Sequence, residues 1–225
     1  MPRLTPALLS PLLLASSLAL VASPALAQST SLDGVSRITV EAGWRRTTNR
    51  TFLDGYYARP EHQGRQRAAS SPGGPLLALT FAYAVNEYVE LGVDLFGAGE
   101  RLSLSGSPRL TTVTYGALVG LRLQTLLEGV GPHGLIPWLG LLSGPTLVLS
   151  TFEGEPGTEG VKQAWGASAG ASLRLSPRWA ATLELRQVLV RGPVKGLGSV
   201  NGGGSWLGLG ATYSFDAEPS RPVNW

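Results

Sequence analysis

The side chains that most often carry catalysis or bind metals are scarce in this sequence. Its 225 residues contain two histidines, His62 and His133, and no cysteine. Without cysteine there is no disulfide scaffold, thiolate nucleophile, Cys-ligated metal site or Cys-anchored lipoprotein. No acid lies at helical or strand ligand spacing to both histidines, so we expect no metal site and no cofactor. Gly202-Gly203-Gly204 has no following helix or lysine, which is typical of a flexible loop and not of a phosphate-binding loop.

The charged residues are few and carry both signs. They make up 15% of the chain, and 18 Lys+Arg against 15 Asp+Glu give a formal net charge of +3. The basic residues are mostly arginines scattered among the acids, so we expect no nucleic-acid partner. Low charge combined with 30 glycines is also unusual for a cytoplasmic enzyme.

The first 27 residues have the layout of a secretory signal peptide. Met1-Pro2-Arg3 is a short positive start, residues 7–22 are apolar and rich in leucine, and Ala25-Leu26-Ala27 is a small-x-small cleavage site. An N-terminal membrane anchor is the alternative, but Ser and Pro residues interrupt a run that barely spans a bilayer. We therefore expect cleavage after Ala27 and export of residues 28–225.

The exported part alternates apolar and small or polar residues with a period of two. The clearest example is Thr112–Gln124, where Val113, Tyr115, Ala117 and Val119 share one face. Such alternation predicts half-buried strands and not helices. Because no later stretch has the roughly 20 apolar residues of a spanning helix, a membrane location requires a closed barrel. The eight expected strands are Ile38–Arg45, Leu77–Val85, Val89–Phe96, Thr112–Gln124, Ile136–Leu147, Trp165–Leu175, Trp179–Arg186 and Trp206–Phe215.

The connections between these segments alternate in length. The short ones are Asn86-Glu87 and Ser176-Pro177-Arg178, with a medium link over 124–134, whereas long loops are expected over 46–73, 97–108, 150–160 and 192–204. Short periplasmic turns and longer external loops are typical of outer-membrane barrels. The prediction is an all-β protein: an eight-stranded antiparallel up-and-down transmembrane barrel over 28–215 with a short periplasmic tail over 216–225. Segment 136–147 is the least clear, because Leu141 and Leu142 place apolar groups on both faces.

Three stretches carry a resemblance to a known family. Pro137–Leu141, Gly166–Leu173 and Gly210–Phe215 resemble successive strands of the small eight-stranded outer-membrane barrels, the OmpA/OmpX/OmpW-like group. The resemblance covers essentially the whole exported chain and implies location in the cell outer membrane. It also implies that Gly210, Tyr213 and Phe215 form the signal read by the barrel assembly machinery. Gly208 stands where that signal usually has a polar residue, and ten residues follow Phe215, where the signal usually ends the chain.

Single charges fall on the faces opposite the apolar ones. In a membrane barrel these faces point inward, because a charge facing lipid near the midplane costs about 2–4 kcal/mol. They form either a plug of ion pairs or a polar path, and the plug is favoured because eight strands enclose little more than side chains. The residues concerned are Glu41, Arg45, Glu90, Asp94, Arg122, Arg174, Glu184 and Arg186.

The first long loop is rich in arginine. Facing outward, its guanidinium groups would meet lipopolysaccharide phosphates, which arginine binds in bidentate fashion. The alternative is a mobile, solvated loop with no particular ligand. The arginines are Arg46, Arg50, Arg59, Arg65 and Arg67.

An enzymatic function is not indicated. Some eight-stranded barrels modify lipid A, and the deacylase type needs a nucleophilic serine beside a histidine. Neither His62 nor His133 has the His-x-Ser spacing of that family. Tyr56, Tyr57 and Trp206 are expected to be barrel-rim aromatics. The sequence thus predicts a structural or surface-interacting outer-membrane barrel, with a narrow pore or a soluble lipocalin-like barrel with an inward apolar face as alternatives.

Overall fold

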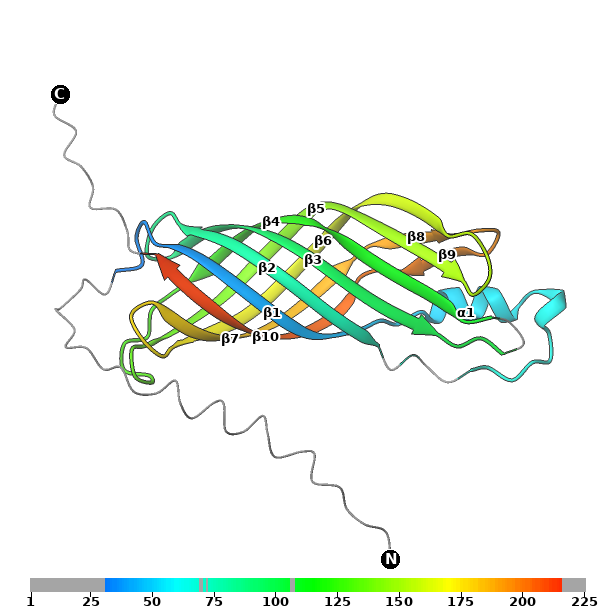
Figure 1. Cartoon of the computed structure of the whole chain (residues 1–225), viewed down its shortest axis with the longest axis horizontal. Coiled ribbons are helices and arrows are strands. Elements are labelled where there is room, and N and C mark those ends of the chain that lie inside the picture. The colour runs from blue at the N-terminus through cyan, green and yellow to red at the C-terminus, as the bar shows by residue number, and fades with distance from the viewer. Residues whose placement is uncertain (1–30, 69–70, 72, 106–107, 216–225) are drawn as a thin grey trace, which may run out of the picture. The chain divides into compact units, whose positions relative to one another are not determined.

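A computed structural model describes residues 31–68, 71, 73–105 and 108–215 of the chain. The predicted signal peptide and the predicted tail lie outside the described residues. Eight antiparallel strands close into a barrel in the order β1-β10-β7-β6-β5-β4-β3-β2 (Figure 1). The strands are β1 (Ser36–Arg46), β2 (Gly74–Ala84), β3 (Val89–Leu102), β4 (Leu110–Gln124), β5 (Leu135–Phe152), β6 (Thr158–Arg174), β7 (Trp179–Leu189) and β10 (Gly204–Phe215). The predicted fold class is confirmed.

The register of the strands fixes their tilt. One row of paired residues starts at Ser36, passes Tyr83 on β2, continues around the barrel to Ser205 on β10 and returns to β1 at Arg46. The row therefore advances by ten residues (46 minus 36) in one circuit of eight strands. With strands about 4.8 Å apart and a rise of about 3.3 Å per residue, this shear corresponds to a tilt of about 40°. The oblique strands are visible in Figure 1.

Apolar side chains cover the outside of the barrel. Exposed aliphatic residues lie between two sets of exposed aromatics, with Trp44, Tyr115 and Trp165 toward one end. Tyr83, Tyr88, Trp179 and Phe215 lie near the end that holds Ser36. On β7 the exposed residues Trp179 and Leu189 are ten residues apart (189 minus 179), which is about 25 Å along the barrel axis at this tilt. A band of this height flanked by aromatics matches the hydrocarbon region of a membrane.

The soluble lipocalin-like alternative is wrong, because the apolar face points outward and the charged face inward. In the part of the chain that the structure describes, no helix has both the length and the apolar character needed to cross a bilayer.

Two of the expected long loops are largely strand. β3 continues to Leu102 and β4 begins at Leu110, so the connection is 103–109 and not 97–108. β5 and β6 likewise leave only 153–157 between them. The sequence prediction ended each strand where the outward-facing apolar residues stopped. Beyond the aromatic set the outer face meets water and the inner face is packed, so the inward residues become apolar and the outward residues polar. On β3, Phe96, Ala98 and Leu102 point inward and Arg101 points outward.

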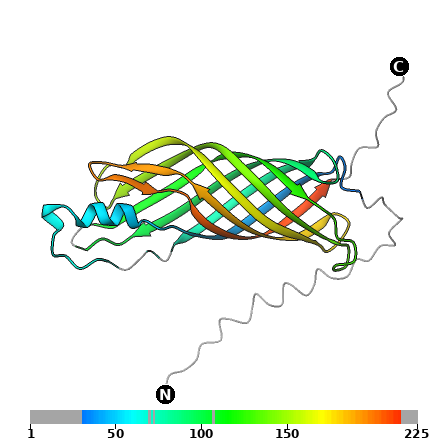
Figure 2. The same cartoon turned by 180° about the vertical axis from the view of Figure 1, so that it is seen from behind.

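A small cap closes the barrel end opposite Ser36 and Phe215. It contains helix α1 (Arg50–Tyr57), the single turn η1 (Pro60–His62) and a hairpin of β8 (Arg191–Val194) and β9 (Gly198–Asn201), which replaces the loop expected over 192–204. Both α1 and the hairpin lie at this end in each view (Figure 2). We call the apolar residues buried between them the cap cluster: Phe52, Tyr56, Tyr57, Leu102, Leu104, Leu110, Val194 and Val200.

The barrel interior is layered along its axis, and the inward residues of β3 show the order. Glu90 and Asp94 come first and belong to a buried polar layer. Phe96 and Ala98 follow and join an apolar layer, in which Leu142 and Trp206 also lie. Glu100 is polar again, and Leu102 belongs to the cap cluster. From the Ser36 end, the interior is thus polar, apolar, polar and finally capped.

Candidate functional site

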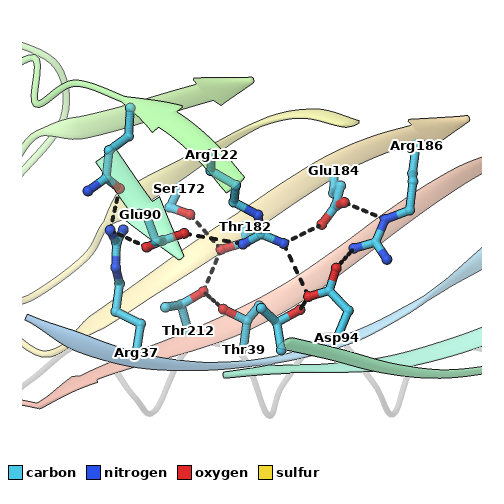
Figure 3. Close-up of polar contacts among 12 residues, drawn as sticks. Arg37, Thr39, Glu90, Asp94, Arg122, Ser172, Thr182, Glu184, Arg186 and Thr212 are labelled. Carbon is cyan, nitrogen blue, oxygen red and sulfur yellow. Dashed lines mark hydrogen bonds and ion pairs between the residues drawn. The ribbon is translucent and has the colours of Figure 1, made fainter. Parts of the chain in front are cut away.

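Arg122 on β4 is the centre of the first polar layer (Figure 3). Its Nη1 lies 3.4 Å from Glu90 Oε1, and its Nη2 lies 3.4 Å from Asp94 Oδ1 and 3.8 Å from Glu184 Oε2. Glu90 and Asp94 face Arg122 from the neighbouring β3, and Glu184 reaches it from β7 across the interior. One guanidinium therefore joins three strands through three carboxyl groups.

Two further arginines extend the pairing to both sides of Arg122. Arg37 on β1 lies 2.5 Å from Glu90 Oε2 and also donates to the side-chain amide oxygen of Gln124. Arg186 on β7 donates from Nε to Glu184 Oε1 at 2.7 Å and places Nη2 2.9 Å from Asp94 Oδ2. All five paired side chains around Arg122 are at most 7% exposed. The contacts form one continuous network across the barrel.

A row of hydroxyl groups ties four strands together beside these ion pairs. Thr39 and Thr212 are 2.8 Å apart, Thr212 and Thr182 are 2.7 Å apart, and Thr182 and Ser172 are 2.9 Å apart. Each hydroxyl can both donate and accept, so one direction of donation can run through the whole row. The row links β1, β10, β7 and β6, whereas the ion pairs link β1, β3, β4 and β7 (Figure 3).

The first polar layer holds three arginines and four acids. The arginines are Arg37, Arg122 and Arg186, and the acids are Glu41, Glu90, Asp94 and Glu184. Glu41 is buried on β1 in the same layer. Gly208 and Gly210 leave room for this arrangement, because a Cβ at either position would contact the Glu41 side chain at 3.0 Å or less.

Two tryptophans line the guanidinium groups from inside the barrel. Arg122 lies over the Trp138 ring at 4.4 Å and Arg186 over the Trp206 ring at 5.3 Å. Gly170 provides the space for Trp138, since a Cβ there would lie 2.4 to 2.7 Å from the indole. This glycine of β6 thus has a packing role. The expectation that Trp206 is a rim aromatic is wrong: it is 3% exposed and packs on Phe96 inside the barrel.

The inward charges singled out in the sequence do not all meet. Glu41, Glu90, Asp94, Arg122, Glu184 and Arg186 lie in the first polar layer. Arg174 stands apart, because it is half-buried at the turn end of β6 and donates to the carbonyl oxygen of Pro177. Sequence reasoning missed Arg37, although extending the alternation of β1 by one more step from Thr39 would have found it. Glu100 was missed because it fell in an expected loop.

Arg45 forms the second polar layer, just below the cap. Its side chain is fully buried, donates to Thr114 Oγ1 at 3.0 Å and to the Gly202 carbonyl, and lies 3.6 Å from Glu100. Thr47 donates to the same carboxylate. Asn49 donates in turn to Thr47, and its own side-chain oxygen accepts from the backbone N–H of Asn201 on β9. This layer therefore joins the barrel wall to the hairpin of the cap.

The arginine-rich first loop is folded over the barrel mouth. Arg67 lies 2.7 Å from Asp54, Arg65 donates to the Ser105 carbonyl at 3.3 Å, and Arg59 donates to the Gly196 carbonyl in the hairpin turn. Arg46 and Arg50 are exposed at the end of β1 and the start of α1. The loop is thus ordered by contacts with the other loops, while its guanidinium groups stay at the surface.

Tyr57 also connects the loops of the cap. Its hydroxyl oxygen accepts from the backbone N–H groups of Ser105 and Ala68, each at 3.1 Å. Burial acts to raise the pKa of Tyr57, but these two donors and the nearby Arg67 favour the phenolate, and the net effect lowers the pKa. Tyr56 and Tyr57 are buried in the cap cluster and are not rim aromatics as expected.

The remaining singled-out residues lie apart from the polar layers. Gly210, Tyr213 and Phe215 lie on β10, where Tyr213 packs edge-on against both Phe215 and Trp179 at 5.0 Å. His62 stacks on Tyr56 at 4.0 Å, and His133 lies in the turn between β4 and β5. Among residues 31–68, 71, 73–105 and 108–215 there is no group of three or more His, Asp or Glu side chains arranged to hold a metal ion.

Comparison with known proteins shows the fold. No protein-family model and no curated protein sequence matches the chain. The outer membrane protein OprG from Pseudomonas aeruginosa is similar in structure, with a TM-score of 0.56 and 13% identity over 82% of this chain and 97% of OprG. Neisserial surface protein A is 14% identical over 81% of this chain and 98% of its own, with a TM-score of 0.48. The chain has the fold of the small outer-membrane barrels, as the sequence resemblance predicted.

Proposed function

We propose that this chain is an outer-membrane β-barrel with a closed interior and a structural, surface-interacting role. The observation that carries the proposal is the paired network of the first polar layer. A water-filled lumen would leave its arginines and acids exposed, whereas Arg37, Arg122 and Arg186 are each at most 6% exposed. Eight strands enclose a space that side chains can fill, and here charged, aromatic and aliphatic layers fill it in turn.

Two further layers support closure. Above the ion pairs, Phe96, Leu118, Leu142 and Trp206 form the apolar layer, which offers no partner to a hydrated ion. Above that layer, the Arg45 contacts attach the cap to the barrel wall. A solute that crossed the barrel would have to displace all of these groups, so transport through the axis is not the function that this geometry favours.

The membrane location is tested by gel mobility of the refolded chain (residues 28–225) in detergent, with and without boiling. A closed membrane barrel resists SDS until it is heated, so the unboiled and boiled bands are expected to separate. Closure is tested on the same material by swelling of lipid vesicles in small sugars. We expect no swelling above that of protein-free vesicles. A single gel band from a chain that is soluble without detergent would contradict the membrane location, and rapid swelling would contradict closure.

We also propose that the first loop contacts lipopolysaccharide at the outer surface. Arg46, Arg50, Arg59, Arg65 and Arg67 stand in a loop with only two acids, Asp54 and Glu61. Because this loop is ordered over the mouth, its guanidinium groups are held at one surface, where phosphate groups can be bound in bidentate fashion. The barrel assembly machinery remains the expected partner for insertion, with Gly210, Tyr213 and Phe215 as its signal.

Lipopolysaccharide binding is tested by titrating the refolded chain in detergent and comparing two variants. Arg46→Ser combined with Arg50→Ser removes two of the exposed loop arginines, at the end of β1 and the start of α1. Arg174→Ser combined with Arg178→Ser removes the same charge from the opposite end. We expect the first pair to weaken binding by about tenfold or more, since each lost phosphate contact costs on the order of 1 kcal/mol, and the second pair to leave it unchanged. Equal loss in both variants would contradict a specific role for the loop.

A further inference from the structure

The lipid-facing surface of the barrel carries a groove of about 530 Å³ that extends from β3 across β4, β5 and β6 to β7. Small groups form its floor: Ser143, Ala167 and the backbone at Gly120 and Gly166. Gly120 presents only backbone there, because its Cβ direction points inward to Leu142. Large apolar side chains rise on either side, and they include Val119, Leu141, Trp165 and Leu189. The groove is therefore a furrow in the apolar band and not an opening into the interior.

The groove ends at the aromatic set nearest the cap. Its lower part is lined by Leu91 and Leu121, which are paired on β3 and β4 within the apolar band. Its upper part is lined by Trp165 and Leu189, which are paired where β7 ends. It thus runs from the middle of the band to the boundary at which lipid headgroups begin.

A second, polar cleft of about 400 Å³ lies directly above this upper end. Lys162, Gln163, Arg191 and Ser199 line it, and its lining contains no acid. Arg191 follows Leu189 by two residues and Lys162 precedes Trp165 by three. Gln163, in the cleft, donates to Ser143 Oγ in the groove at 2.7 Å. The two hollows therefore meet at this hydrogen bond, one apolar and one with two positive charges.

We propose that the groove and the cleft together bind one lipid A molecule, with an acyl chain in the groove and a phosphorylated sugar at Lys162 and Arg191. The inference rests on the proposed function, because it needs the capped end of the barrel to lie in the outer leaflet. An acyl chain matches an apolar furrow that opens at headgroup depth. Two cations without an acid match a phosphate, and the Gln163 and Ser199 side chains supply hydrogen bonds for a sugar.

The test is native mass spectrometry of the refolded chain in detergent, titrated with diphosphorylated lipid A. Parallel titrations use phosphatidylethanolamine and inorganic phosphate. We expect one lipid A per chain at concentrations at which neither of the other probes binds. Ala167→Phe, which fills the groove, and the pair Lys162→Gln with Arg191→Gln are each expected to weaken lipid A binding by about tenfold. Ala167→Leu repeats the groove test with a smaller side chain.

Matched controls place the same changes elsewhere. Ala42→Phe enlarges an outward residue of β1, far from the groove in the register, and Lys195→Gln removes a charge from the hairpin turn outside the cleft. Equal loss in Ala42→Phe and Ala167→Phe would overturn the groove, and unchanged binding in the Lys162/Arg191 variant would overturn the phosphate site. Equal binding of phosphatidylethanolamine would overturn the choice of lipid A. Separate boiled and unboiled bands for every variant show that each one still forms the membrane barrel, so a loss of lipid A binding is then a failure of the lipid site and not of the barrel on which the proposed function rests.

Discussion

The two ends of the barrel interior are closed by different forces. Near the Ser36 end, Arg37, Arg122 and Arg186 are paired with acids from strands on opposite sides of the barrel, so each contact joins parts of the wall. At the other end, the cap cluster buries the side chains of α1 and of the hairpin against the tips of β3 and β4. The polar layer therefore joins strands of the wall to one another, whereas the cap packs α1 and the hairpin onto the tips of the strands.

The largest effect is expected from Arg122→Met, which removes the centre of the polar layer. Glu90, Asp94 and Glu184 would then face one another with less compensation. Removing one partner of a buried ion pair costs about 3–5 kcal/mol, so we expect the free energy of unfolding to fall by this amount. The measurement is urea unfolding from lipid vesicles, followed by tryptophan fluorescence.

Two further variants sharpen this result. Arg109→Met removes an exposed arginine and should change the free energy of unfolding by at most about 0.5 kcal/mol. Adding Glu184→Gln to Arg122→Met should recover part of the loss, because it removes one acid while Arg37 keeps Glu90 and Arg186 keeps Asp94 as partners. A loss in Arg122→Met no larger than that in Arg109→Met would mean that the network does not hold the wall together.

A smaller and more local effect is expected from Tyr56→Ala in the cap cluster. Tyr56 is 1% exposed, and its truncation leaves a cavity between α1 and the hairpin. Because most residues of the cap cluster come from α1, the hairpin and a loop, we expect the cap to open locally while the barrel keeps its unboiled SDS mobility. Trypsin cleavage after Arg50, Arg65 or Arg67, measured by mass spectrometry, should become faster. Loss of the unboiled band would show that the cap and the barrel unfold together.

Tyr57→Phe should have a still smaller effect. It removes the oxygen that accepts from Ser105 and Ala68, at a cost of about 0.5–1.5 kcal/mol for each lost hydrogen bond. The amides of Ser105 and Ala68 should therefore exchange with deuterium faster than in the unchanged chain. Unchanged exchange at both amides would show that the Tyr57 hydroxyl does not connect these loops.

The same residue predicts a pH effect of known sign. Burial raises the pKa of Tyr57, but the hydrogen bonds from Ser105 and Ala68 outweigh it and the pKa is lowered. The pKa of Tyr57 is therefore lower in the folded chain than in the unfolded chain. This difference stabilises the cap fully at a pH above the unfolded-state pKa, and the stabilisation is lost as the pH falls through the folded-state pKa. A titration of tyrosinate absorbance should show one tyrosine below its ordinary pKa of about 10 that is missing in Tyr57→Phe. Identical titrations would contradict this assignment.

Particular residues show what the sequence could and could not predict. The alternation from Val113 to Val119 predicted both the strand and its lipid-facing side. In a wall between lipid and a polar interior, every second residue is apolar and faces lipid, so the pattern is visible in the sequence. The ambiguity at Leu141 and Leu142 has a physical reason: Leu141 is 69% exposed outside, and Leu142 is buried in the apolar layer within the barrel. Both faces of β5 are apolar there, so no alternation exists to be read.

The pairing of charges and the cap lay beyond the sequence for a different reason. Which acid meets Arg122 depends on the shear of the barrel, since Glu184 comes from a strand on the far side of the interior. The cap depends on contacts between loops separated by more than a hundred residues, such as Asn49 with Asn201. Neither the register nor such distant contacts leave a local pattern in the chain.

The central claim, a closed interior, is tested most directly by single-channel recording in planar lipid bilayers. The unchanged chain and a variant that lacks the cap and carries Arg122→Met are inserted under the same voltage and salt. A closed interior predicts no steady open current from the unchanged chain, and at most brief current bursts from the variant, which has lost the cap and the centre of the ion-pair network but keeps the apolar layer. A stable, voltage-independent open conductance from the unchanged chain would contradict it and would make the barrel a pore.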